Sequence, residues 1–264
     1  MSKLRVLDLF SGIGGFSLGL ERTGGFETVA FCEIDPFCQR VLAKHWPEVP
    51  IYDDVERLSA NRLRDDRIGG IDVICGGFPC QDISFAGGGL GLDGQRSGLW
   101  REIVRLIGEL RPQYALVENV AALLARGMDT VCGDLADCGY DAEWSVVSAC
   151  ALGAPHMRRR VFILAYPNSV DGRPRVRHTP SLESRAVQAV NDFTGSRARW
   201  RARMEDPSAL YRGADGVPDR VDRNRAIGNA VAPEVIEMIG RLILEASGPP
   251  RSAVLITDYL RRQT

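Results

Sequence analysis

A cysteine that follows a proline is the residue of this chain best suited to nucleophilic chemistry. The pentapeptide Gly77-Phe78-Pro79-Cys80-Gln81 comes directly after an apolar run, 71–75, of the kind that forms a buried strand. Glycine permits a sharp exit from a strand and proline fixes its own φ, so we expect the thiol of Cys80 to be held rigidly near the strand end. A structural cysteine in a loop is the alternative that this pentapeptide alone leaves open.

A glycine-rich turn near the start of the chain indicates a site for a nucleoside cofactor. The apolar stretch 6–10 leads into the turn Gly12–Gly15 and then into a helix pattern. Ser17 stands where the dinucleotide fingerprint needs its third glycine, which weakens a pyrophosphate-binding interpretation. Glu33 closes the next apolar run, a position suited to binding ribose hydroxyls.

A third candidate is Glu118, which follows the apolar run 114–117. A carboxyl group at the end of a parallel strand lies on the same sheet edge as Cys80 and can meet the same substrate. The alternatives are that Glu118 caps the following helix or lies in a solvated loop.

Strand-like and helix-like segments alternate along the chain, and they must position these residues. The expected strands cover 4–10, 28–32, 71–75, 114–117 and 161–165, and the expected helices cover 17–22, 35–46, 99–110, 131–138 and 231–246. This alternation predicts an α/β fold with a doubly wound, mainly parallel sheet and with ligands at the carboxyl ends of its strands.

The bulk properties favour one sizeable α/β domain of an unexported protein. The chain has 264 residues, seven cysteines without C-x-x-C spacing and no apolar run near 18 residues, so we expect a cytoplasmic protein with no disulfide framework, metal site or membrane segment. The net charge is −1, but residues 158–225 hold fifteen arginines against eight acidic residues. Such a basic segment is typical of contact with a phosphate backbone, although 31 arginines against two lysines can also reflect compositional bias.

Taken in order, these motifs resemble those of the DNA (cytosine-5) methyltransferase family across residues 1–166 and 225–245. The segments that carry the resemblance are Asp8–Gly15, Glu33–Asp35, Asp53–Val55, Gly77–Gln81, Glu118–Val120, Arg158–Val161 and Gly228–Pro233. The resemblance implies the α/β fold of S-adenosylmethionine-dependent methyltransferases and methyl transfer to carbon 5 of a flipped-out cytosine in duplex DNA.

The resemblance also implies a role for each candidate catalytic residue. Cys80 would add to ring carbon 6 of the cytosine, and Glu118, with a raised pKa, would contact ring nitrogen 3. Arg160, with Arg158 beside it, would bind the carbonyl oxygen of the base. No metal is required.

For the cofactor, S-adenosyl-L-methionine, the resemblance places Phe10 against the adenine, Glu33 on the ribose and Asp54 on the adenine amine. The expected cofactor-binding residues are Phe10, Gly12, Ile13, Gly14, Gly15, Glu33, Ile34, Asp54, Val55, Pro79, Leu99, Asn229 and Val231.

The resemblance divides the chain into a catalytic domain, 1–166 plus 225–264, and a short target-recognition region, 167–224. It implies a monomer that acts on double-stranded DNA, with a cognate restriction endonuclease as a further candidate partner. His156 stands where the family usually has glutamine, and the ninth motif is not recognisable. An RNA cytosine methyltransferase, which would carry a Cys-Phe-Thr signature that is absent here, and a binding protein without turnover are the competing interpretations.

Overall fold

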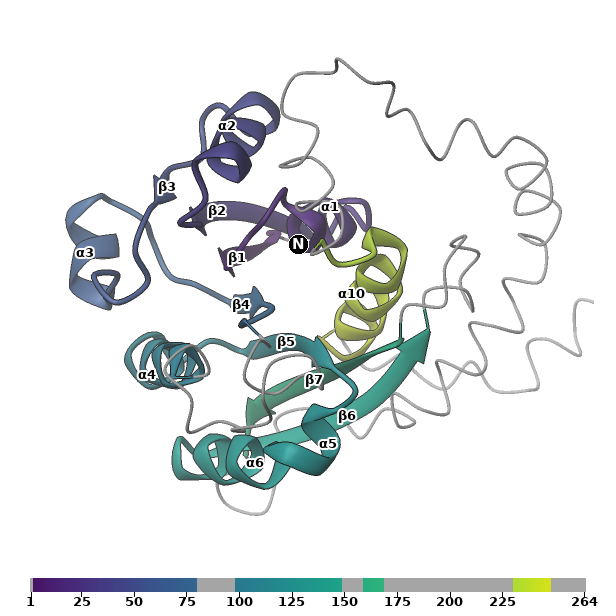
Figure 1. Ribbon diagram of the computed structural model, residues 1–264. Coiled ribbons are helices and arrows are strands. Elements are labelled where there is room, and N and C mark those ends of the chain that lie inside the picture. Colours follow the sequence, from purple (N-terminus) through teal and green to yellow (C-terminus); the bar gives the residue numbers. More distant parts are fainter. Residues whose placement is uncertain (1, 80–97, 149–158, 169–229, 248–264) are drawn as a thin grey trace, which may run out of the picture.

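A seven-stranded sheet forms the centre of the computed structural model, which describes residues 2–79, 98–148, 159–168 and 230–247 (Figure 1). Its strand order is β3-β2-β1-β4-β5-β7-β6. The strands are β1 (Leu4–Leu9), β2 (Phe26–Cys32), β3 (Ile51–Tyr52), β4 (Val73–Gly76), β5 (Tyr114–Val120), β6 (Tyr140–Ser148) and β7 (Arg159–Pro167).

The sheet is mainly parallel, as predicted. Strands β1 to β5 pair in parallel, and β7 runs antiparallel to both of its neighbours, β5 and β6. The chain winds outward from β1 to β3 and then from β4 to β5 on the other side, so the order reverses between β1 and β4. In such a sheet the carboxyl ends of the parallel strands share one edge, which is where ligands bind.

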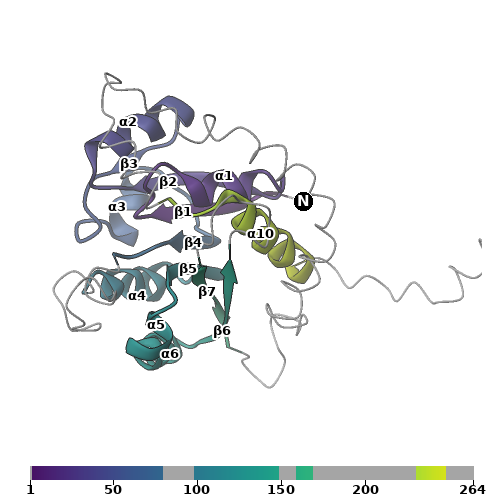
Figure 2. The same cartoon turned by 45° about the vertical axis from the view of Figure 1, so that its right-hand side comes forward.

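Helices cover both faces of the sheet, each with its own hydrophobic core. The helices α3 (Ala60–Asp65), α4 (Leu99–Leu110), α5 (Leu123–Arg126) and α6 (Met128–Asp137) pack into one core. On the other face α1 (Gly15–Glu21) and α10 (Pro233–Ser247) lie side by side (Figure 2). The helix α2 (Pro36–His45) packs beside β3. Burial on both faces explains why the central strands read as continuous apolar runs.

Local signals account for the helices that were predicted. The carboxylate of Asp35 accepts hydrogen bonds from the backbone N–H groups of Phe37 and Cys38, and Pro36 occupies the first turn, where its missing N–H costs nothing. The predicted segment 35–46 is therefore α2 together with its two caps. The helix predicted at 99–110 matches α4.

Two strands and two short helices were not predicted. β3 has only two residues, and β6 is an edge strand in which only Tyr140 and Val147 are buried and polar residues are interspersed, so neither contains a long apolar run. The predicted end of the strand at residue 117 was wrong, because β5 continues to Val120. The helices α3 and α5, of six and four residues, are too short to show a periodic pattern.

None of the helices in the described ranges is long and apolar enough to span a membrane. Apart from residues 167 and 168, the predicted recognition region, 167–224, lies outside the residues that the structure describes.

Candidate active site

The turn after β1 takes three left-handed backbone conformations within five residues. Phe10 has φ 50°, Gly12 54° and Gly14 83°. The hydroxyl of Ser11 closes the turn by donating to the carbonyl oxygen of Asp8 at 2.6 Å. A left-handed conformation at Phe10 is uncommon for a residue with a side chain, and such strain concentrates at functional sites.

Glu33 ties this turn to the end of β2. Its carboxylate accepts a hydrogen bond from the backbone N–H of Gly12 at 2.7 Å and another from that of Asp35 at 2.8 Å. The side chain of Gln39 donates to the carbonyl oxygen of Glu33 at 2.6 Å. Each carboxylate oxygen has a further lone pair, so a held and nearly buried Glu33 can still accept from a ligand hydroxyl.

The predicted adenine-contacting residues lie at the same edge of the sheet. Ile34 is 77% exposed next to the buried Glu33, and Asp54 follows β3. The carboxylate of Asp54 accepts from the backbone N–H of Glu56 at 2.9 Å and forms an ion pair with Arg57 at 3.2 Å. Val55, also predicted to line the cofactor, is buried in the core below.

Two residues distant in sequence pack against the back of the glycine turn. A Cβ atom at Gly14 would lie 2.7 Å from the indole ring of Trp46, and one at Gly15 would lie 2.8 Å from the carbonyl oxygen of Val231. Val231, from the last of the motif segments, therefore lies directly behind the glycine turn. Trp46 was not predicted, because its only signal is its place at the end of an amphipathic helix.

A buried carboxyl group, Asp8, lies beneath the turn and was also not predicted. It accepts hydrogen bonds from the hydroxyl and the backbone N–H of Ser17, at 2.7 and 3.3 Å, and so caps the start of α1 from the neighbouring strand. Burial raises the pKa of Asp8 to about 7, against the lowering effect of the Ser17 hydrogen bonds. Burial and nearby Asp8 in turn raise the pKa of the Cys75 thiol.

The segment that leads to Cys80 is fixed on two sides. The side chain of Phe78 is 3% exposed and packs against Trp100 with ring centroids 5.4 Å apart, and the Phe78 carbonyl oxygen accepts from the amide of Asn119 at 3.1 Å. A Cβ atom at Gly77 would lie 2.7 Å from a carboxylate oxygen of Glu118. The backbone therefore passes directly beside Glu118 three residues before the predicted nucleophile.

Glu118 and Arg160 face each other across the antiparallel pair β5 and β7. Glu118 lies opposite Phe162 and Arg160 lies opposite Val120, so the two side chains are diagonal neighbours on one face. The Nε atom of Arg160 lies 2.8 Å from a carboxylate oxygen of Glu118, and their side chains are 25% and 11% exposed. Glu118 lies within a strand that continues to Val120, not at a strand end or in a loop.

The structure thus brings together the cofactor turn, Glu33, the nucleophile segment and the Glu118–Arg160 pair along one sheet edge. Pro79 and Leu99, predicted to line the cofactor, border the undescribed stretch 80–97 on its two sides. Three predicted site residues, Cys80, Arg158 and Asn229, lie outside the described residues, as does His156. In the described part of the chain no cluster of three or more potential metal ligands is present.

Comparison with known proteins gives consistent results. A family model described as C-5 cytosine-specific DNA methylase matches residues 4–204. The chain is 40% identical over 170 residues to the type II methyltransferase M2.BsuMI of Bacillus subtilis (strain 168), covering 61% of this chain and 42% of that protein. It is 34% identical over 200 residues to the type II methyltransferase M.Sau3AI of Staphylococcus aureus, covering 68% of this chain and 47% of that protein.

Among solved structures, the fold is similar to that of the S. pombe Dnmt2 methyltransferase, with a TM-score of 0.62 and 18% identity over 92% of this chain and 99% of that one. The chain spans less than half the length of the two curated relatives above.

Proposed function

The chain belongs to the C-5 cytosine-specific DNA methylase family, and from this premise we propose that it transfers a methyl group from S-adenosyl-L-methionine to carbon 5 of a cytosine in duplex DNA. The reaction proceeds through a transient bond between the sulfur of Cys80 and carbon 6 of the base. The cytosine is swung out of the duplex, because its ring is otherwise covered by the stack, at a cost of a few kcal/mol.

The observation that carries this proposal is the position of the Glu118–Arg160 pair. A carboxylate and a guanidinium lie 2.8 Å apart at the sheet edge, and a Cβ built at Gly77, in the segment that leads to Cys80, would lie 2.7 Å from the carboxylate. A nucleophile, an acid and a cationic donor are the three groups that an electron-poor pyrimidine needs around its ring. The structure of the described residues supports the last two of them and the approach to the first.

Cys80 initiates the reaction as a thiolate. A free thiol has a pKa of about 8.5, so only a small fraction is thiolate near neutral pH, and a cationic neighbour would favour the reactive form. The sulfur forms a bond with ring carbon 6, and the electron pair of the 5,6 double bond moves to carbon 5, which becomes nucleophilic. Carbon 5 then forms a bond with the methyl group that the bound cofactor would supply, as the bond between that methyl group and the sulfonium sulfur breaks. The carbon-5 proton passes to water, its electron pair restores the double bond, and the carbon–sulfur bond breaks, which returns the thiolate.

Glu118 and Arg160 stabilise the charge that this addition creates. Glu118 acts at ring nitrogen 3 and the exocyclic amine, which also distinguishes cytosine from thymine, and Arg160 donates to the carbonyl oxygen at carbon 2. Because both groups are largely removed from solvent, their interaction with the base is stronger than it would be in water. Arg158 acts beside Arg160 at the same oxygen.

The glycine turn fits S-adenosyl-L-methionine. Among the described residues no atom lies within 4 Å of a Cβ built at Gly12, whereas Gly14 and Gly15 are closely backed, so the open side of the turn is at Gly12. Ile13 and the turn backbone would hold the methionine part of the cofactor, Glu33 its ribose and Asp54 its adenine amine. The residues that would surround the cofactor are Phe10, Ile34, Pro79, Leu99, Asn229 and Val231. When bound there, the cofactor supplies an electrophilic methyl group on its sulfonium sulfur.

Residues 167–224 form the target-recognition region in this proposal, and the remainder forms the catalytic domain. The arginines of that region contact DNA phosphates. The protein works as a monomer in the cytoplasm, within a restriction–modification system that includes a cognate endonuclease.

Incubation of the purified protein with duplex DNA and methyl-labelled cofactor tests the proposal. We expect label in the DNA, 5-methylcytosine on base analysis, and loss of transfer in the Cys80→Ser variant, since an alcohol is a far weaker nucleophile than a thiolate. Equal transfer by the serine variant would contradict the covalent mechanism. Label in structured RNA and not in DNA would show that the substrate is RNA.

A further inference from the structure

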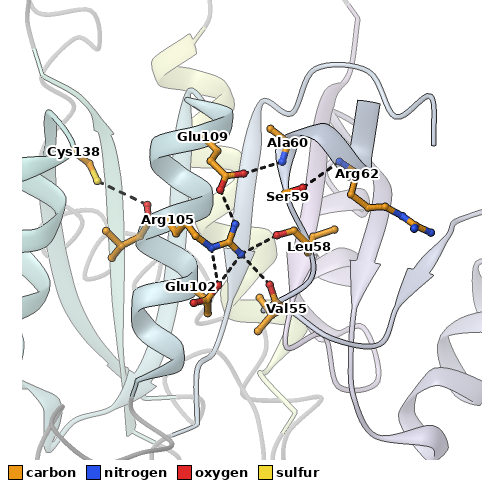
Figure 3. Close-up of polar contacts among 10 residues, drawn as sticks. Val55, Leu58, Ser59, Ala60, Arg62, Glu102, Arg105, Glu109 and Cys138 are labelled. Atoms are coloured by element: carbon orange, nitrogen blue, oxygen red, sulfur yellow. Dashed lines mark hydrogen bonds and ion pairs between the residues drawn. The ribbon is translucent and has the colours of Figure 1, made fainter. Parts of the chain in front are cut away.

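One helix, α4, holds the segment that directly follows Asp54. Arg105, at the middle of α4, reaches out to this segment, residues 55–60, which runs from Val55 to the first residue of α3 (Figure 3). Its Nη2 atom donates to the carbonyl oxygens of Val55 at 3.1 Å and Leu58 at 2.8 Å. Two loop carbonyls are therefore tied to a single guanidinium on a helix.

Two glutamates of α4 hold that guanidinium in place. The Nε atom of Arg105 donates to Glu102 at 2.8 Å and Nη1 donates to Glu109 at 2.6 Å. Glu109 also accepts from the backbone N–H of Ala60 at 2.9 Å, which adds a third backbone contact to the loop. The planar guanidinium suits this geometry because it presents several donors in fixed directions, which a lysine ammonium does not.

The side chain of Asp54 is oriented by the same segment. Its carboxylate accepts from the N–H of Glu56, and its carbonyl oxygen accepts from the N–H of Arg57 at 3.3 Å. Val55 and Leu58, on either side of these contacts, are the residues held by Arg105, and both are buried. Without the hydrogen bonds from Arg105 to Val55 and Leu58, the loop would lose the backbone geometry that orients the side chain of Asp54.

The first turn of α4 is also fixed. The indole N–H of Trp100 donates to Asp134 at 2.7 Å, and its ring packs on Phe78. Arg105 therefore projects from a helix that is anchored at its start, so that the loop, and not the helix, is the element that moves when the contacts at Arg105 are lost.

We propose that Arg105 is a positioning residue for the cofactor, acting through Asp54 by holding the 55–60 segment. This inference rests on the proposed function, because it takes the ligand of Asp54 to be S-adenosyl-L-methionine. Arg105 touches neither the cofactor nor the base, so its effect appears in cofactor binding and in the KM for the cofactor, while kcat at saturating cofactor is unchanged.

Calorimetric titration of the full chain with S-adenosyl-L-methionine tests the proposal. Because Arg105→Gln loses hydrogen bonds from a charged donor, we expect its Kd for the cofactor to rise about tenfold. Arg105→Lys keeps the charge but loses the planar set of guanidinium donors, so we expect its Kd to rise about threefold. The matched control is Arg62→Gln, which removes an exposed arginine from the adjacent α3, where its guanidinium pairs with Asp66. Its Kd is expected to stay at the wild-type value.

A double-mutant cycle with Asp54→Ala separates positioning from general destabilisation. If Arg105 acts through Asp54, Arg105→Gln has little effect on Kd once Asp54 is gone, although it lowers the melting temperature equally in both backgrounds. An equal rise in Kd in both backgrounds overturns the proposal, as does an unchanged Kd in a folded Arg105→Gln or Arg105→Lys protein. Failure of the wild-type protein to bind the cofactor would instead overturn the proposed function.

Discussion

The cofactor half of the site is held by backbone hydrogen bonds, whereas the base half depends on a pair of charged side chains. Around the glycine turn, Glu33 accepts from backbone N–H groups of two loops and Asp54 accepts from one of its own. Across β5 and β7, Glu118 and Arg160 face each other directly. Hydrogen bonds to the backbone fix the positions of Glu33 and Asp54, whereas Glu118 and Arg160 can exchange their ion pair for contacts with a charged substrate. In the proposed function, the first half binds the cofactor and the second takes part in the reaction.

The largest effect is expected from neutralising the acid of the base half. Glu118→Gln keeps the shape of the side chain but removes the charge and the exchangeable proton, so kcat should fall about 10²–10⁴-fold. The Kd for S-adenosyl-L-methionine should change by less than about twofold, because the cofactor half keeps its contacts. Single-turnover methyl transfer and calorimetric titration measure the two quantities.

The matched control for this substitution is Glu237→Gln, which breaks the 2.7 Å ion pair between Glu237 and Arg241 on the surface of α10. Its kcat should be that of the wild type. A Glu118→Gln variant that lost cofactor binding together with kcat would show that the two halves are not separable.

An intermediate effect is expected from Asp8, the carboxyl group beneath the cofactor turn. Its folded-state pKa of about 7 exceeds the ordinary value of 3.8, mainly through burial, so the folded protein binds the proton more tightly than the unfolded chain does. The resulting stabilisation is complete below about pH 3.8 and is lost as pH rises towards 7, which removes about 3 kcal/mol between pH 5 and pH 8.

Asp8→Asn should remove this part of the pH dependence, because the amide stays neutral while its oxygen still accepts from Ser17. Urea unfolding of both proteins at pH 5 and pH 8 measures the difference. A variant that follows the wild-type pH profile would show that folding does not raise the pKa of Asp8.

The smallest effect is expected from crowding the back of the cofactor turn. Gly14→Ala places a methyl group 2.7 Å from the ring of Trp46, and overpacking of this kind costs about 1–3 kcal/mol. The control is Gly24→Ala, at φ +79°, where the described residues leave the Cβ position open within 4 Å. Both substitutions carry the same left-handed strain, so the additional loss of thermal stability and cofactor affinity at Gly14 isolates the contact with Trp46. Equal losses would mean that backbone strain alone is responsible.

Much of the parallel core was predictable from sequence because its signals are local. A strand buried on both faces must be a continuous apolar run, as 71–75 and 114–117 are, and a turn that needs positive φ must favour glycine, as at Gly12 and Gly14. The edge strand β6 was missed because it is partly exposed to solvent: Trp144 is 47% exposed, and polar residues interrupt any apolar run in the strand.

The supporting contacts of the site could not be read in the same way. Trp46 and Arg105 belong to no motif, and Asp8 begins one without any sign of its supporting role; each acts on a partner through tertiary packing. Only the three-dimensional structure shows that Trp46 lies over Gly14 or that Arg105 meets Val55. The pairing of Glu118 with Arg160 depends on the antiparallel direction and register of β7, which an isolated apolar run does not specify.

The contact between α1 and α10 has a consequence for the order of biosynthesis. The apolar face of β1 and α1 is made first, but it is covered by Val235, Ile236 and Ile239, which come more than 200 residues later. Gly19 admits the start of α10 so closely that a Cβ there would lie 2.5 Å from the carbonyl oxygen of Pro233. At a translation rate of about 5–20 residues per second, that face waits about 10–40 s on the ribosome for its cover. Until residues 235–239 have been made, this apolar face of the nascent chain therefore stays without its native cover.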